Sequence, residues 1–158
     1  MKRLDLIARG NIGEVVGGSG ESSGRISAQN SSGDIYIYNL TGAKQKLNTT
    51  ILHDGVSKKH FICIQNDGNE SDAFNVQGTK ENSLFSVKYL NGTTNVTAAM
   101  VAGTFNTSTL AHGESLILKA AITAKTPLVG QKRKFSIQAT SAADSAAADK
   151  GLIKATSN

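Results

Sequence analysis

The segment of residues 60–76 constrains the fold more than any other part of the chain. Apolar residues occupy every second position on both sides of a polar turn: Ile62, Ile64, Phe74 and Val76. A period of two is typical of β-strands, because successive side chains point to opposite faces of a sheet. Asp67-Gly68 between the two runs favours a hairpin, since Gly reaches positive φ without a Cβ clash. The segment therefore predicts two antiparallel strands joined by a tight turn.

The same alternation recurs along the 158-residue chain. Turn residues separate the runs at the spacing of a β-sandwich, so we expect an all-β, antiparallel sandwich of about 8–10 strands with little or no helix. The expected strands cover residues 4–8, 25–29, 35–38, 45–52, 57–65, 72–78, 84–89, 116–122, 135–140 and 152–156, with one or two more within 96–105. Ser141–Asp149 is Ala-rich and is the one helix candidate. We prefer to interpret it as the connection between the last two strands.

Strand parity also predicts which residues form the core. The expected inward residues are Ile62, Ile64, Phe74, Val76, Phe85, Val87, Tyr89, Leu116, Leu118, Ala120, Ile122, Phe135, Ile137 and Ala139. Burying a large apolar side chain contributes about 1.5–3 kcal/mol, so this set is enough to stabilise a domain of this size.

Some strands are apolar on both faces. Phe61 and Cys63 alternate with the inward isoleucines, and Tyr36, Tyr38 and Ile117 lie in runs of the same kind. An antiparallel sheet with one solvated face is polar on that face. A second covering layer would explain the pattern, and contact with another subunit would explain it equally well. These five residues are therefore candidates for an assembly interface.

The first 24 residues differ from the rest in composition. Residues 4–8 alternate as a strand does, and Gly and Ser dominate residues 10–24. That composition is typical of a flexible linker, a long surface loop or a hinge that lets the first strand leave its own sheet. We expect residues 1–24 to form an N-terminal strand and hinge, and residues 25–158 to form the sandwich. Leu4, Leu6 and Ile7 are then further interface candidates.

The formal net charge is +5. Basic residues are spread along the chain in short groups: Lys2-Arg3, Lys44 and Lys46, Lys58-Lys59, and Lys132-Arg133-Lys134. Nucleic-acid binding needs a basic stripe with aromatic residues for stacking, so we expect no nucleic-acid partner. Solvated strand ends and loops explain the groups best. Like charges on neighbouring loops could still form a patch that meets an acidic glycan or an anionic subunit.

No catalytic pattern is present. His53, His60 and His112 are dispersed, the single cysteine Cys63 fits a small apolar residue in a strand, and no phosphate-loop motif occurs. We therefore expect no enzyme activity and no cofactor.

A calcium loop has a faint signal. Asp67, Asn69, Ser71 and Asp72 place oxygen atoms at close spacing, but the EF-hand pattern with its terminal Glu is absent. Turn chemistry is the preferred explanation, because Asp and Asn side chains bond their own backbone.

Seven Asn-x-Ser/Thr sequons occur, at Asn30, Asn39, Asn48, Asn69, Asn91, Asn95 and Asn106. They predict N-glycosylation of a surface protein. The clustering of Asn, Ser and Thr in turns explains them equally well.

Gln65–Val76 resembles the "QNDGN-x-x-D-x-F-x-V" segment of immunoglobulin-like repeat modules in large bacterial and archaeal surface proteins. Phe85–Gly92, Thr109–Ser115 and Ala139–Asp144 match the same modules in the same order, with His112 in place of their usual Pro. The resemblance covers about residues 34–156. These modules are similar to sandwich domains appended to glycosidases and adhesins. The resemblance implies an immunoglobulin-like sandwich but no particular role, since such sandwiches host many functions.

The location follows from several weak signals. Residues 4–9 are too short and too charged for a signal h-region, and no run approaches the ~18 apolar residues of a membrane span. A mature or excised chain, a cytoplasmic product and a virion component all fit. The charged fraction of 18% is below the usual ~25%, which is common in secreted and surface proteins. We expect an extracellular or surface location, with a virion as an alternative.

Three functions follow, in order of preference. The first is a non-catalytic structural subunit of a filament, surface layer or virion coat that self-associates as a homo-oligomer or polymer. It would use strand addition and its apolar sheet faces. The second is a carbohydrate-binding or adhesive accessory module, although the chain has no Trp for sugar stacking. An enzyme comes last.

Overall fold

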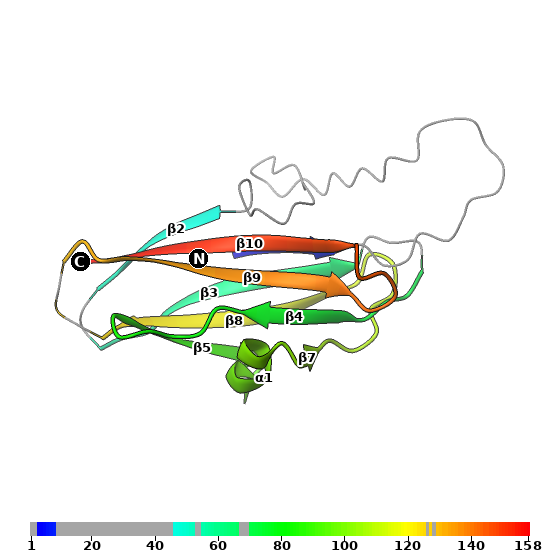
Figure 1. The fold of residues 1–158 in the computed structure, drawn as a ribbon, viewed down its shortest axis with the longest axis horizontal. Coiled ribbons are helices and arrows are strands. Elements are labelled where there is room, and N and C mark those ends of the chain that lie inside the picture. Colours follow the sequence, from blue (N-terminus) through cyan, green and yellow to red (C-terminus); the bar gives the residue numbers. More distant parts are fainter. Residues whose placement is uncertain (1–2, 9–45, 53–54, 67–69, 126, 128) are drawn as a thin grey trace.

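Two five-stranded sheets face each other across an apolar core in this computed structural model (Figure 1). The structure describes residues 3–8, 46–52, 55–66, 70–125, 127 and 129–158. The elements of these residues are β1 Arg3–Ala8, β2 Lys46–Ile51, β3 Lys58–Asn66, β4 Phe74–Gly78, β5 Phe85–Asn91, β6 Thr94–Asn95, α1 Thr97–Ala102, β7 Phe105–Asn106, β8 Ser115–Ala124, β9 Lys132–Ser141 and β10 Ala148–Ser157. The predicted all-β sandwich is confirmed.

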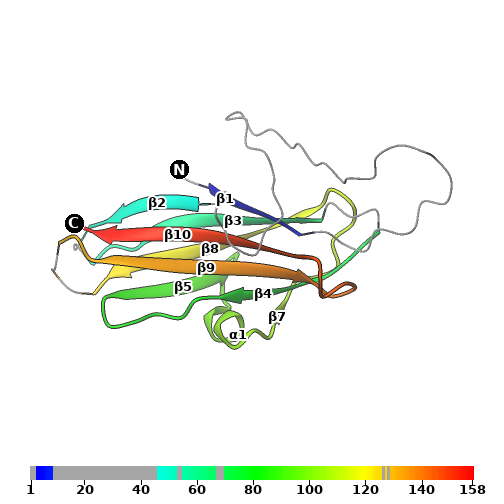
Figure 2. The same ribbon diagram turned by 45° about the horizontal axis from the view of Figure 1, so that its top comes forward.

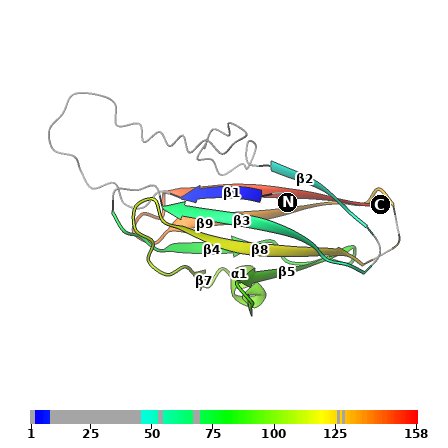
Figure 3. The ribbon, with the colours of Figure 1, turned by 180° about the vertical axis from the view of Figure 1, so that it is seen from behind.

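Sheet A has the strand order β1-β3-β8-β5-β6. Its central strands β3, β8 and β5 are antiparallel, and β1 adds to the edge beside β3 in the parallel direction (Figure 3). In this pairing Leu4 aligns with Ile62, and Leu6 aligns with Ile64. Strand β1 therefore belongs to the sandwich, whereas residues 10–24 lie outside the described residues.

Sheet B has the strand order β2-β10-β9-β4-β7. Strand β2 runs parallel to β10 at one edge (Figure 2), and the other pairs are antiparallel. The parallel pairs at the edges of both sheets were not expected, because an apolar period of two reports burial and not strand direction.

The core lies between the sheets, as strand parity predicted. Every predicted inward residue is buried except Leu116, which is partly buried. Phe85 of sheet A and Phe135 of sheet B meet edge to face, with ring centroids 6.4 Å apart and an interplanar angle of 88°. The buried Tyr89 hydroxyl donates to the Thr79 carbonyl at 2.9 Å. Burial raises the pKa of this phenol, and the nearby charge of Arg133 offsets part of the rise.

The hairpin predicted for residues 60–76 is wrong. Strand β3 pairs with β1 and β8 in sheet A, whereas β4 pairs with β7 and β9 in sheet B. The connection therefore crosses from one sheet to the other. The cause is that strands on opposite sides of a core show the same inward alternation as strands paired side by side. The Asn91-Gly92 turn is a hairpin as predicted, with Gly92 at φ 60° between β5 and β6.

A second correction concerns residues 96–105, which were expected to hold one or two strands and of which only Phe105 begins a strand, β7. Helix α1 occupies Thr97–Ala102 and packs the fully buried Met100 into the core. Its Ala-rich sequence favours helix, and Gly103 at φ 72° ends it. Residues 142–147 connect β9 to β10 without a helix, so the preferred interpretation of that segment is confirmed. The strands expected at 25–29 and 35–38 lie outside the described residues.

Candidate functional site

Four lysines from three strands share the outer surface of sheet B. We call this surface the basic face and define it by Lys46 of β2, Lys132 and Lys134 of β9, and Lys154 of β10. Each lies at a position alternate to the buried residues of its own strand. The β-sheet period of two therefore places all four on the side away from the core.

The strand register brings these lysines together. Lys154 pairs directly with Lys134 across β10 and β9, and with Asn48 across β10 and β2. On the next outward rung Thr156 lies between Lys132 and Thr50. Neighbouring strands are about 4.8 Å apart, and outward residues of one strand repeat about every 6.7 Å. The result is a grid of ammonium, hydroxyl and amide groups.

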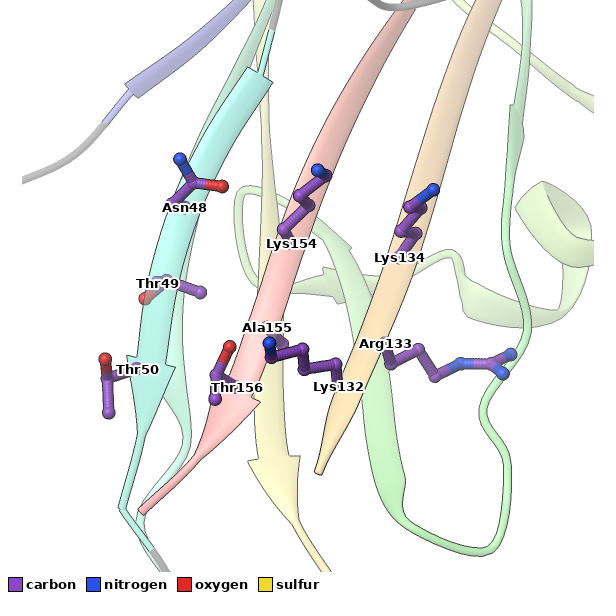
Figure 4. Close-up of a pocket in the computed structure, with 9 residues that line it drawn as sticks. All are labelled: Asn48, Thr49, Thr50, Lys132, Arg133, Lys134, Lys154, Ala155 and Thr156. Atoms are coloured by element: carbon purple, nitrogen blue, oxygen red, sulfur yellow. The ribbon is translucent and has the colours of Figure 1, made fainter. Parts of the chain in front are cut away.

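A hollow of about 630 Å³ lies over this grid. Figure 4 shows Lys134 and Lys154 side by side on their strands, with Lys132 nearer the start of β9. The lining residues are Asn48, Thr49, Thr50, Lys132, Arg133, Lys134, Lys154, Ala155 and Thr156. None of the acidic side chains in the described part of the chain lines it.

Arg133 lines the hollow but is engaged elsewhere. Figure 4 shows its side chain pointing away from Lys132 and Lys134. The guanidinium lies 5.4 Å from the centre of the Phe135 ring, and Nη2 donates to the Lys80 carbonyl at 2.7 Å. We therefore assign Arg133 to the packing of the sandwich end and not to the basic face.

Like charges on the basic face lower the pKa of Lys154. The pKa of Lys154 is lowered, first by the charge of Lys46, and further by partial desolvation, the charge of Lys134, a hydrogen bond with Lys46 and the charge of Lys132. Like charges directly opposite on antiparallel strands destabilise a sheet. The repulsion between these lysines therefore lowers the stability of the folded chain.

The substitution Lys154→Gln is expected to raise Tm slightly at low ionic strength, because it removes this repulsion. The gain should shrink in 1 M salt, where the Debye length is about 3 Å. The pKa of Lys154 is lower in the folded chain than in the unfolded chain, where it is 10.5. Above pH 10.5 Lys154 is neutral in both states, and its repulsion costs the folded chain no stability. This stability is lost as pH falls through the lowered pKa, because the folded chain then carries the extra charge. Scanning calorimetry against pH and salt measures both effects, with the exposed Lys88→Gln on sheet A as control.

Two of the predicted interface residues expose apolar surface on the outer face of sheet A. Phe61 is half-buried, Ile117 is 46% exposed, and Cys63 pairs with Ile117 across β3 and β8. Cys63 itself is only 2% exposed, so its thiol offers little surface. Tyr36 and Tyr38 lie outside the described residues, and of Leu4, Leu6 and Ile7 only the backbone pairing is described. The proposed interface remains a prediction.

Asp72, a predicted calcium candidate, is buried and forms an isolated β-bridge with Leu110. Its carboxylate accepts bonds from the Ala73 amide at 2.8 Å, the Ala143 amide at 3.3 Å and the Ser141 hydroxyl. Asp67 and Asn69 lie outside the described residues, and Ser71 is exposed. Across the described ranges no group of three or more His, Cys, Asp or Glu side chains could hold a metal ion.

The remaining candidates are spread over the molecule. His60 is buried near the start of β3 and His112 lies before β8, at the opposite end of the sandwich, while His53 lies outside the described residues. Among the sequons, Asn48 and Asn106 are exposed, and exposed Asn95 accepts bonds from Thr97. Asn91 is half-buried, and Asn30, Asn39 and Asn69 lie outside the described residues. Within the described residues no helix is long and apolar enough to cross a membrane.

The basic face was missed because its members are far apart in the sequence. The groups at 44–46 and 132–134 were expected in strand ends and loops, and Lys154 was not singled out. The available signal was parity: Lys132 and Lys134 alternate with buried positions, as Lys154 does. Only the pairing of β2, β10 and β9 shows that these positions adjoin.

No protein-family model and no curated protein matches the sequence. One similar solved structure is the secreted serine protease VesC from Vibrio cholerae, with 14% identity, 72% of this chain and 22% of that chain covered, and a TM-score of 0.45. The E. coli chaperone DraB has 11% identity, coverage of 72% and 52%, and a TM-score of 0.38. The multicopper oxidase Fet3p has 13% identity, coverage of 97% and 27%, and a TM-score of 0.33. This chain thus spans about half or less of these chains, and similarity at this level assigns neither a family nor an activity.

Proposed function

We propose that this chain is a non-catalytic structural module, an immunoglobulin-like sandwich that self-associates in an extracellular or surface assembly. The proposal rests on the position of β1 at the edge of sheet A. This strand is the outermost strand of sheet A, and residues 9–45 separate it in sequence from β2. The seven sequons and the low charged fraction support the surface location.

Strand β3 needs a partner on this edge. Without β1 it would expose a row of unpaired N–H and C=O groups, which recruits strands from other chains. The β1 segment of a second copy offers the same sequence and the same register as the chain's own. The two pairings therefore have nearly equal contact energy, and the effective concentration of the two strands decides between them.

The apolar surface next to this edge favours exchange between copies. Phe61 is the register partner of Arg3 on β1, and exposed Ile117 lies one strand further in. A neighbour that donates β1 would come close to this surface and could cover it. Strand addition of this kind gains affinity from main-chain hydrogen bonds.

The native Cys63 supplies a direct test. Asp5 is its register partner on β1, and the neighbouring backbones lie about 4.8 Å apart, within the Cα separation of about 4.4–6.8 Å that a disulfide requires. In an Asp5→Cys variant oxidised under native conditions, strand exchange predicts disulfide-linked dimers and higher species on a non-reducing gel. Light scattering of the wild-type chain should show matching oligomers.

Two matched variants control for random oxidation. Ile7→Cys places the thiol beside Gln65, one outward position away from Cys63, and should crosslink much less. The double variant Asp5→Cys with Cys63→Ser should form no disulfide between β1 and β3, because it lacks the thiol at position 63. Complete oxidation to a disulfide-linked monomer would overturn the proposal, because it would show that β1 stays in its own chain.

A further inference from the structure

We propose that the basic face binds an extended polyanionic polysaccharide, one that carries carboxylates or sulfates along its chain. The ligand would lie in the hollow over β2, β10 and β9. Lys134 and Lys154 would pair with its charges at the centre and Lys132 at one end, and Lys46, which lies on the same face outside the lining of the hollow, would pair with them at the other end. This site is separate from the β1 edge, which lies in the other sheet.

The first argument is that the site destabilises the fold when no ligand is bound. Lys154 and Lys134 are direct antiparallel partners, an arrangement that destabilises a sheet. A carboxylate at either position would convert the repulsion into attraction, yet none lines the hollow in the described part of the chain. A bound polyanion would remove the repulsion, so binding and folding would be coupled.

The second argument is the regular spacing. The sheet places the Cα atoms of these lysines about 5 Å apart across strands and about 7 Å apart along them. A ligand with one charge on each sugar or two can meet several of these cations at once. A small monovalent anion would meet only one or two, so affinity should increase with chain length.

The third argument is the chemistry between the lysines. Thr50, Thr156 and Asn48 supply hydroxyl and amide groups that can donate to and accept from sugar hydroxyls. Aromatic side chains are absent from the nine lining residues. Nucleic-acid bases stack on aromatic platforms, so this surface suits a charged sugar better than single-stranded nucleic acid.

The test is a binding titration of the wild-type chain by calorimetry, at low and at moderate salt. The probes are dextran sulfate, polyuronate (alginate), neutral dextran and a single-stranded oligonucleotide. We expect binding of at least one acidic polysaccharide, weakening with salt, and no binding of neutral dextran. The two acidic probes distinguish sulfate from carboxylate as the preferred group.

The variant Lys134→Gln with Lys154→Gln should weaken this binding by about 10–30-fold, since each lysine near an anionic surface is worth about a factor of five. The matched control is Lys59→Gln with Lys88→Gln. These lysines are exposed, flank Ala121 on sheet A and change the net charge equally. The control should bind as the wild type does, and both double variants should keep the wild-type circular dichroism spectrum.

Three outcomes would overturn the proposal. Equal weakening in both double variants would show that net charge, and not this face, attracts the polymer. Binding of the oligonucleotide alone would indicate a nucleic-acid surface. The absence of binding to every probe at low salt would remove the site altogether.

Discussion

Truncation of Phe135 to alanine is expected to lower the free energy of unfolding by about 3–5 kcal/mol, a large part of the total of about 5–15 kcal/mol for a domain. Phe135 is fully buried in β9, and its ring contacts that of Phe85 from the other sheet. Arg133 stacks over the same ring at 5.4 Å. One substitution therefore removes a contact between the sheets and leaves a cavity in the core.

Urea unfolding followed by circular dichroism measures this loss. Phe135→Leu is the matched control and should cost much less, because it keeps most of the volume and loses the ring geometry. A double-mutant cycle with Phe85→Leu should give a coupling energy of about 0.5–1.5 kcal/mol. A loss below 1 kcal/mol in Phe135→Ala would contradict this packing of the two sheets.

Strand parity predicted the core because it depends on the backbone alone. Phe74 and Phe135 lie at positions that face inward whichever strand lies beside them, so no knowledge of pairing was needed. Leu116 is the exception, since it lies near the start of β8, where the sandwich covers it only in part.

Strand pairing was harder to predict than strand position. Residues 60–76 contain two real strands, but the alternation of Ile62 and Phe74 is the same for paired strands as for strands that face each other across a core. The Asp67-Gly68 signal reports a turn and not which sheet the chain enters next. Helix α1 was missed for a related reason: six residues are too few for a helical period to stand out against alternation.

The basic face depends on three strands that are not adjacent in sequence. Lys46 precedes Lys154 by more than 100 residues, and the parallel β2–β10 pair that joins them leaves no local sequence signal. A surface built from sheet register can be found only once the strand order is known. The same holds for the β1–β3 pair on which the proposed exchange rests.

Asp72→Ala is expected to destabilise the chain by roughly 3 kcal/mol or more, because hydrogen bonds to a charged group contribute about 1.5–3 kcal/mol each. Asp72 is 4% exposed, and its carboxylate joins the end of β9 to the start of β4 through Ser141, Ala143 and Ala73. Removal of the carboxylate leaves the buried Ser141 hydroxyl and the part-buried hydrogen bonds of the Ala73 and Ala143 amides without this acceptor. Urea unfolding measures the loss.

Asp72→Asn is the informative control, since it keeps the shape and one acceptor oxygen and should lose less than the alanine variant. Ser141→Ala tests the partner, and its loss should overlap with that of Asp72→Ala in a double-mutant cycle. Calcium separates the two roles considered for this residue. A carboxylate held by hydrogen bonds alone predicts the same Tm of the wild type with and without millimolar calcium. A calcium-dependent rise in Tm that disappears in Asp72→Asn would instead make Asp72 a calcium ligand, and the hydrogen bonds to its carboxylate would then describe only the metal-free state.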